Sequence, residues 1–211
     1  MVRSRVAIVG VVVAVCAAIA GLAIALAAVV NGSGSGRAPA PSGSAPAEPV
    51  TVDDFCYVEA MIYYRVEAVD LANAVLDKSG ISAETQAFAQ QLVDTQSAEL
   101  EKLRPWYVSW KDARPLERPD DGPCKGHGTT HAQMPGLPTP SQWNDLIAAD
   151  GPEAEEMFLE LLTAQNDAMV DFVNLVLEGD PHSRVLASAE QVLAQAEADD
   201  ARLQALLAGL T

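Results

Sequence analysis

Two stretches of this chain, residues 53–106 and 153–207, have the pattern of the same helical hairpin. The first contains MIYYRVEAVDLA and the second contains LTAQNDAMVDFV, and each is followed at a similar distance by a glutamine, Gln96 or Gln195. One hairpin cannot bury its apolar face alone, whereas two of them close a four-helix bundle. The repeat therefore predicts an all-α fold, and its chemistry depends on the side chains that point into the middle.

Apolar residues at alternating spacings of three and four mark the helices, and no strand pattern occurs. Capping residues, glycines and prolines set the expected ends. We expect a first helix from Thr51 to Gly80, a second from Ser82, a loop over 115–138, a short helix from Thr139, a long helix from Gly151 to Glu178, and a last helix from His182 to about Leu207.

The N-terminal region divides into a short stub, 1–5, an uncharged apolar run, 6–30, and a Gly/Ser/Pro/Ala linker, 31–50, ahead of the bundle, 51–211. The run is long enough to cross a bilayer and exceeds the usual apolar core of a cleaved signal peptide. Two arginines precede it, which places the N-terminus in the cytoplasm. We expect a single-pass cell-membrane protein, anchored by this helix, with an extracytoplasmic C-terminal domain; the alternative is a long cleaved signal peptide.

The chain is acidic, with a formal net charge of −16. Nucleic-acid binding needs a basic surface, and docking on anionic lipid needs basic residues as well. The charge therefore argues against both. An acidic surface can gather cations, but solubility is the simpler interpretation.

Two cysteines, Cys56 and Cys124, follow the apolar run. An even pair in an oxidising compartment predicts a disulfide, here joining the first helix to the middle loop. The rival interpretation is that Cys124 is a soft metal ligand.

Several short motifs occur in an order typical of one family. These are Met61-Ile62, Ala68-Val69-Asp70, Gln96 with Glu99 and Leu100, the Trp106 to Trp110 end of the first hairpin, and Met134-Pro135-Gly136. Over roughly Asp53 to Leu207 the chain resembles the domain of unknown function 305 (DUF305) family, a ferritin-like helical family of bacterial envelope and secreted proteins. The resemblance implies a bundle of this kind.

Some members of that family bind copper or other soft metals through paired histidines and methionines. Here the first histidine pair corresponds to Tyr64 and Arg65, and the second to Gln165 and Asn166. The methionine positions correspond to Leu71, Leu103, Phe172 and Leu203. A guanidinium, a phenol, amides and hydrocarbons make no copper or zinc site. The resemblance therefore predicts the fold without a metal at its centre.

Arg65 lies on the apolar stripe of the first helix, and a buried guanidinium needs a partner. Glu99 is the first expected partner and Asp199 the second; the alternative is an Arg65 that reaches solvent. We predict a polar layer in the core that replaces the metal and fixes helix register. Its members are Tyr64, Arg65, Gln96, Glu99, Gln165, Asn166 and Asp199.

One cluster of copper-compatible side chains remains, in the middle loop: Cys124, His127, His131 and Met134. The simpler interpretation is a solvated loop whose cysteine is tied into the disulfide. The sequence contains no nucleophile, phosphate-loop or zinc-protease motif. We therefore expect a structural or partner-binding envelope protein without a cofactor and not an enzyme, with an envelope protein as partner. The alternative is weak copper binding or buffering by His127, His131 and Met134.

Overall fold

The computed structural model describes residues 47–117, 119–125 and 133–210. Within these ranges the chain forms five α-helices and one short 3-10 helix, and no strand. The elements are α1 (Val52–Leu76), α2 (Ala83–Ser109), η1 (Lys111–Ala113), α3 (Pro140–Ala148), α4 (Gly151–Leu177) and α5 (Ser183–Leu210). The predicted all-α class and the order of the helices are confirmed.

The helices begin where their capping residues predict. Thr51 and Asp54 form a reciprocal capping box at the start of α1, and Thr139 and Gln142 form another at the start of α3. The hydroxyl of Ser82 accepts a hydrogen bond from the Thr85 amide at the start of α2. Each bond satisfies a backbone donor that the first helical turn leaves without a partner.

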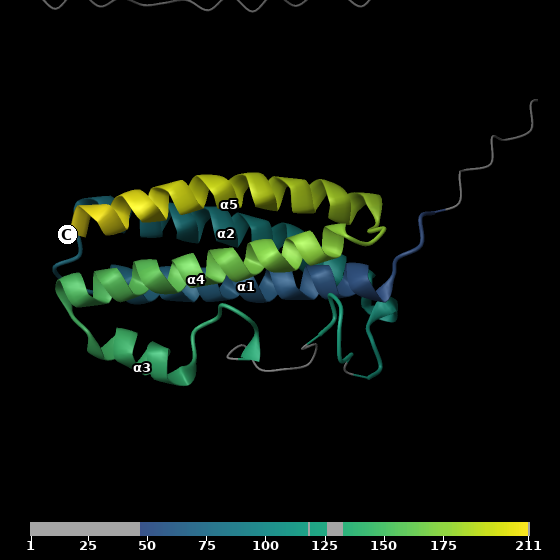
Figure 1. Ribbon diagram of the computed structural model, residues 1–211, viewed down its shortest axis with the longest axis horizontal. Helices are drawn as coiled ribbons and strands as arrows, with labels where there is room; N and C mark the ends of the chain where they lie inside the picture. Colours follow the sequence, from purple (N-terminus) through teal and green to yellow (C-terminus); the bar gives the residue numbers. More distant parts are fainter. Residues whose placement is uncertain (1–46, 118, 126–132, 211) are drawn as a thin grey trace, which may run out of the picture. The chain divides into compact units, whose positions relative to one another are not determined.

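The four long helices lie side by side in two antiparallel hairpins, α1 with α2 and α4 with α5 (Figure 1). Helix α3 and the connector before it run along the outside of α1 and α4. The indole nitrogen of Trp143 donates a hydrogen bond to the Glu67 carboxylate, which fixes α3 against α1. The long connection between the hairpins thus packs along one side of the bundle.

The buried apolar residues form two separate clusters along the length of the bundle. On α1 the first cluster reaches Tyr64 and the second starts at Ala68, and on α4 the second ends at Leu162 and the first starts at Met169. Four of the buried residues between the two clusters are polar: Arg65, Gln96, Gln165 and Asn166. The core therefore contains a polar layer near the middle of its length.

Gly136 stands where the connector crosses α4, and its φ of 73° is in the left-handed region. A Cβ there would lie 2.5 Å from the Cβ of Ala168 and 2.6 Å from the carbonyl oxygen of Ala164. Only glycine fits this contact, because any side chain would meet the backbone of α4. This close approach accounts for the glycine of the Met-Pro-Gly motif.

The segment just before α1 is attached to the start of α5. The Glu48 carboxylate accepts hydrogen bonds from the amide and the hydroxyl of Ser183, and it lies 3.6 Å from Nε2 of His182. Asp54 accepts a further bond of 2.7 Å from the His182 amide. Residues 47–50, placed in the linker by composition, therefore include a side chain that caps a bundle helix.

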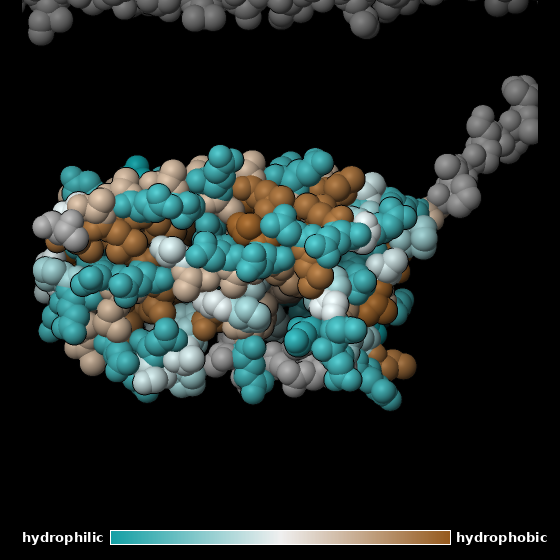
Figure 2. Space-filling view, in the orientation of Figure 1, coloured by the Kyte–Doolittle hydropathy of each residue, from teal (hydrophilic) through white to brown (hydrophobic). Residues whose placement is uncertain are grey.

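In the part of the chain that the structure covers, no helix combines the length and apolar composition needed to cross a membrane. The apolar run over 6–30, predicted to be an anchor, lies outside the described residues, as does most of the linker. On the face of the molecule that Figure 2 shows, hydrophilic residues surround apolar residues, drawn in brown, over α4 and α5.

Candidate functional site: the polar layer and the side pocket

Arg65 is buried in the polar layer, with 6 % of its surface exposed. Its Nη1 lies 3.4 Å from Sδ of Met169 on α4, and its Nε has no hydrogen-bond partner among the described residues. A thioether sulfur is a weak acceptor and carries no formal charge. Burial lowers the pKa of Arg65 below its ordinary value, and electrostatic interactions with Tyr57, Glu99 and Asp199 offset part of that shift.

Glu99, the first expected partner of Arg65, makes no ion pair with it. The Glu99 carboxylate instead bonds Nζ of Lys102 at 2.7 Å, on a side chain that is 38 % exposed. The alternative, in which Arg65 reaches solvent, is also wrong, because the side chain is buried. Within the described ranges no carboxylate oxygen lies within 4.0 Å of the guanidinium.

Asp199 remains in the neighbourhood of Arg65, but its carboxylate accepts a hydrogen bond of 2.9 Å from Gln195 on its own helix. Burial raises the pKa of Asp199, and the hydrogen bond from Gln195 and the charge of Arg65 oppose that shift. Both Arg65 and Asp199 line one small cavity at the centre of the bundle. The two charges therefore interact across this cavity and not through a contact.

The carboxamides of Gln165 and Asn166, the predicted counterparts of the second histidine pair, join neighbouring helices. Nε2 of Gln165 donates a 2.8 Å hydrogen bond to the backbone oxygen of Tyr64, and Nδ2 of Asn166 donates one of 3.1 Å to the backbone oxygen of Ala196. An amide side chain can do this because it carries two N–H donors as well as an oxygen. These bonds tie α4 to both α1 and α5 at the level of the polar layer.

Tyr64 faces a different part of the structure from Arg65. Its hydroxyl donates a 3.2 Å hydrogen bond to the backbone oxygen of Pro135 in the connector. Burial, and next the charge of Asp171, raise the pKa of Tyr64 to about 12. The structure therefore brings together only some of the predicted members of the polar layer. The cavity brings together Arg65, Gln96, Gln165, Asn166 and Asp199, whereas Tyr64 points to the connector and Glu99 lies at the surface.

The positions that correspond to the family's methionines serve packing. Leu71, Leu103 and Leu203 are buried, and Phe172 packs against the core and against Tyr57 and Tyr64. Met169, the residue that contacts Arg65, was not among the predicted members of the polar layer. Its spacing from Gln165 and Asn166 on α4, one turn away, was the available signal.

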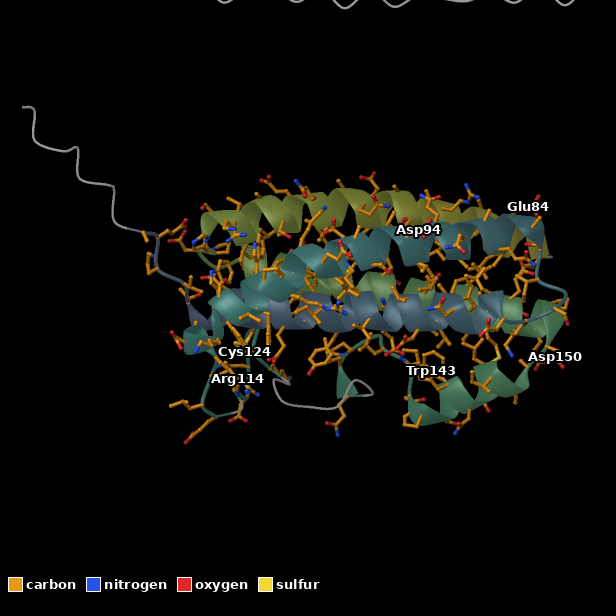
Figure 3. The ribbon with its side chains drawn as sticks, turned by 180° about the vertical axis from the view of Figure 1, so that it is seen from behind. Glu84, Asp94, Arg114, Cys124, Trp143 and Asp150 are labelled. Atoms are coloured by element: carbon orange, nitrogen blue, oxygen red, sulfur yellow. A yellow bond between two sulfur atoms is a disulfide. The ribbon has the colours of Figure 1, made fainter. Side chains whose placement is uncertain are left out.

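The disulfide between Cys56 and Cys124 is present, with a Cα–Cα distance of 5.1 Å, and this prediction is confirmed. It fixes the connector to α1 near the end of the bundle where Arg114 also lies, opposite the end that carries Glu84 and Asp150 (Figure 3). Because its sulfur is bonded to Cys56, Cys124 cannot act as the soft metal ligand of the rival interpretation.

The structure describes only one of the three other candidate ligands in the middle loop. His127 and His131 lie outside the described residues, and Met134 packs against the apolar core. Over residues 47–117, 119–125 and 133–210, no group of three or more His, Cys, Asp or Glu side chains is placed to hold a metal ion.

A larger hollow, the side pocket, lies between α1, α4 and the connector beside the disulfide, with a volume of about 420 Å³. Its walls include Tyr63, Tyr64, Phe172 and Met134, together with the carboxylates Glu59 and Asp171. This volume is in the range of small-molecule sites. The sequence did not predict the pocket, because it depends on how the connector folds back on α1 and α4.

The protein is therefore an all-α bundle of two helical hairpins. It has a polar layer at its centre and a connector that a disulfide fixes to α1. Residues 54–207 match the DUF305 family, a domain of unknown function. The chain belongs to this family.

Two solved structures are similar. One is a crystal structure of "putative secreted protein DUF305" from Streptomyces coelicolor, 20 % identical, covering 76 % of this chain and 92 % of that chain, with a TM-score of 0.62. The other is a DUF305 fragment from Deinococcus radiodurans, 19 % identical, covering 76 % of this chain and 99 % of that chain, with a TM-score of 0.63. At these identities the likeness shows the fold alone. No curated protein matches the chain.

Proposed function

We propose that this protein is an extracytoplasmic binding module that is not an enzyme and holds no metal at the centre of its bundle. One observation supports the absence of a central metal: the guanidinium of Arg65, at a position where the resemblance implies a metal ligand, is buried. A fixed positive charge repels a metal cation, and a guanidinium does not lose its proton to become a ligand.

An extracytoplasmic location is supported by the disulfide, since such bonds persist mainly in oxidising compartments. A structural neighbour described as secreted is consistent with it. The apolar run over 6–30 would tether the module to the cell membrane, with the linker as spacer. In this arrangement the bundle presents its surface to ligands or proteins of the cell envelope.

We assign the binding role to the side pocket. Its aromatic side chains, Tyr63, Tyr64 and Phe172, suit an apolar or aromatic body. Among the described residues that line it, two are carboxylates, Glu59 and Asp171, and one is an ammonium, Lys125, so this part of the wall carries more negative than positive charge. The combination favours a ligand with an apolar body and a positive charge, either a small organic cation or a basic side chain of an envelope protein.

Isothermal titration of the full-length chain tests this role with three probes of similar shape. Phenethylamine is a cation at neutral pH, 2-phenylethanol is neutral and 3-phenylpropionate is an anion. We expect the cation to bind most tightly and the anion least. Asp171→Asn should weaken phenethylamine binding about twofold to fivefold, the effect of one exposed charge, and leave 2-phenylethanol unchanged.

Asp167→Asn is the matched control, because Asp167 is an exposed carboxylate one turn earlier on α4 that does not line the side pocket. It should leave the binding of all three probes unchanged. Equal affinity for cation and anion, or no binding of any probe to the wild-type chain, would contradict the assignment.

A further inference from the structure

The cavity beside Arg65 has the size of a site for a single small molecule. Its volume is about 30 Å³, and side chains of all four long helices line it. A cavity needs roughly 10–15 Å³ to hold one water molecule, and the water also needs polar partners. The space is therefore adequate for one water molecule and too small for an organic ligand.

Three of the residues that line this cavity each have one buried polar atom without a hydrogen-bond partner among the described residues: Nε of Arg65, Oε1 of Gln96 and Oε1 of Gln165. The three residues are 6 %, 4 % and 5 % exposed, so bulk solvent does not supply the missing bonds. One atom is a donor and two are acceptors. A buried polar group that is left unpaired destabilises the fold, which favours a bound partner.

The donor and acceptor count distinguishes water from an anion. A water molecule can accept one hydrogen bond and donate two, which matches the three atoms. An anion would accept a bond from Arg65, but it would face the amide oxygen of Gln165 and the Asp199 carboxylate. Gln165 cannot reverse its amide to help an anion, because its Nε2 already donates to the backbone oxygen of Tyr64.

We propose that this cavity binds one internal water molecule, which accepts a hydrogen bond from Nε of Arg65 and donates to the amide oxygens of Gln96 and Gln165. The water links α1, α2 and α4 at the level of the polar layer. It also hydrates a guanidinium that has no carboxylate in direct contact within the described ranges. This site is independent of the side pocket and of the binding role assigned to it.

Crystallography of the full-length chain grown in sodium bromide tests the proposal. We expect one density peak within hydrogen-bonding distance of the three atoms, without anomalous signal at the bromine absorption edge. A bromide peak in the cavity would show an anion site and overturn the proposal. A cavity without density, or side chains rearranged to bond one another directly, would overturn it as well.

A pair of variants tests the site in solution through nuclear Overhauser contacts between water and the side-chain amide protons of Gln165. In the wild-type chain these contacts should be present. Gln96→Leu fills part of the cavity and removes one acceptor, so the contacts should disappear. Gln91→Leu, at an exposed position on the same helix, should retain them. Contacts that persist unchanged in Gln96→Leu would contradict the proposal, and the crystallographic test stands even if that variant fails to fold.

Discussion

Arg65 on α1 reaches across the core to α4, where its Nη1 lies 3.4 Å from Sδ of Met169. A cation in contact with a neutral sulfur is stabilised far less than a cation bonded to a carboxylate. The desolvation cost of the guanidinium is therefore poorly offset by its contacts. This relationship determines how the polar layer should respond to substitution.

We expect Arg65→Met to leave the free energy of unfolding unchanged or to raise it by about 1–2 kcal/mol, because a similar volume is filled without a buried charge. Arg65→Ala should instead lower it by about 2–4 kcal/mol, because it leaves a cavity. Urea denaturation of both variants measures the difference. Arg202→Met, at an exposed position on α5, is the control and should have little effect. A loss of more than about 3 kcal/mol in Arg65→Met would show that the charge has a strong partner.

The disulfide should contribute to stability by restricting the unfolded chain. It joins residues 68 positions apart, and a bridge of this kind contributes about 2–4 kcal/mol. The double variant Cys56→Ser, Cys124→Ser should melt at a lower temperature than the oxidised protein by a corresponding amount. Intact mass with and without reductant should differ by two protons; two free thiols in the exported protein would refute the bridge.

Glu155 connects α4 to the first turn of α2, where its carboxylate accepts a 2.9 Å hydrogen bond from the Ser82 amide. Burial raises the pKa of Glu155, but the hydrogen bonds from the hydroxyl and the amide of Ser82 lower it, and the pKa lies below its usual value of 4.5. A depressed carboxyl pKa stabilises the fold above the unfolded pKa, and that stability is lost as the pH falls through the folded pKa. Glu155→Gln should therefore cost about 1–2 kcal/mol at pH 7.

The cost of Glu155→Gln should shrink as the pH falls below the unfolded value, since the wild-type carboxyl then becomes protonated as well. Chemical denaturation of both proteins at neutral and acidic pH measures this. Glu156→Gln, the exposed neighbour, should show no such dependence. A difference that stays constant with pH would show that the hydrogen bonds do not depend on the charge of Glu155.

Gly136→Ala should destabilise the fold by about 1–3 kcal/mol, because the new Cβ would meet Ala168 and the backbone of α4 at a positive φ. Gly122→Ala separates backbone strain from steric overlap: its φ is also positive, at 70°, but no atom lies within 4 Å of the added Cβ. It should cost less, about 1 kcal/mol. Thermal melting compares them, and equal losses would mean that close packing of the connector on α4 contributes nothing.

Features that depend on residues close in sequence could be predicted. The capping boxes at Thr51 and Thr139 each involve a side chain three residues away, and both are present. The prediction of where α1 ends was less accurate. We expected Gly80, but the helix ends at Leu76, and Gly80 adopts its left-handed φ in the turn beyond.

Features that depend on packing between helices could be predicted only in part from the sequence. The inward position of Arg65 follows from helical periodicity, but its neighbours depend on which side chains of α4 and α5 lie at the same level along the bundle. Glu99 is on the correct helix and yet turns toward Lys102 at the surface. The side pocket and the central cavity are products of three-dimensional packing, and no local pattern encodes them.

Titration of the full-length chain with Cu(I) and Zn(II), against a chelator of known affinity, tests whether the centre of the bundle lacks a metal site. We expect no tight stoichiometric site, and any weak copper binding should disappear when His127 and His131 are both changed to alanine. Tight binding that survives this double change, and is lost when Gln165 and Asn166 are changed to alanine, would show that the centre of the bundle holds a metal after all.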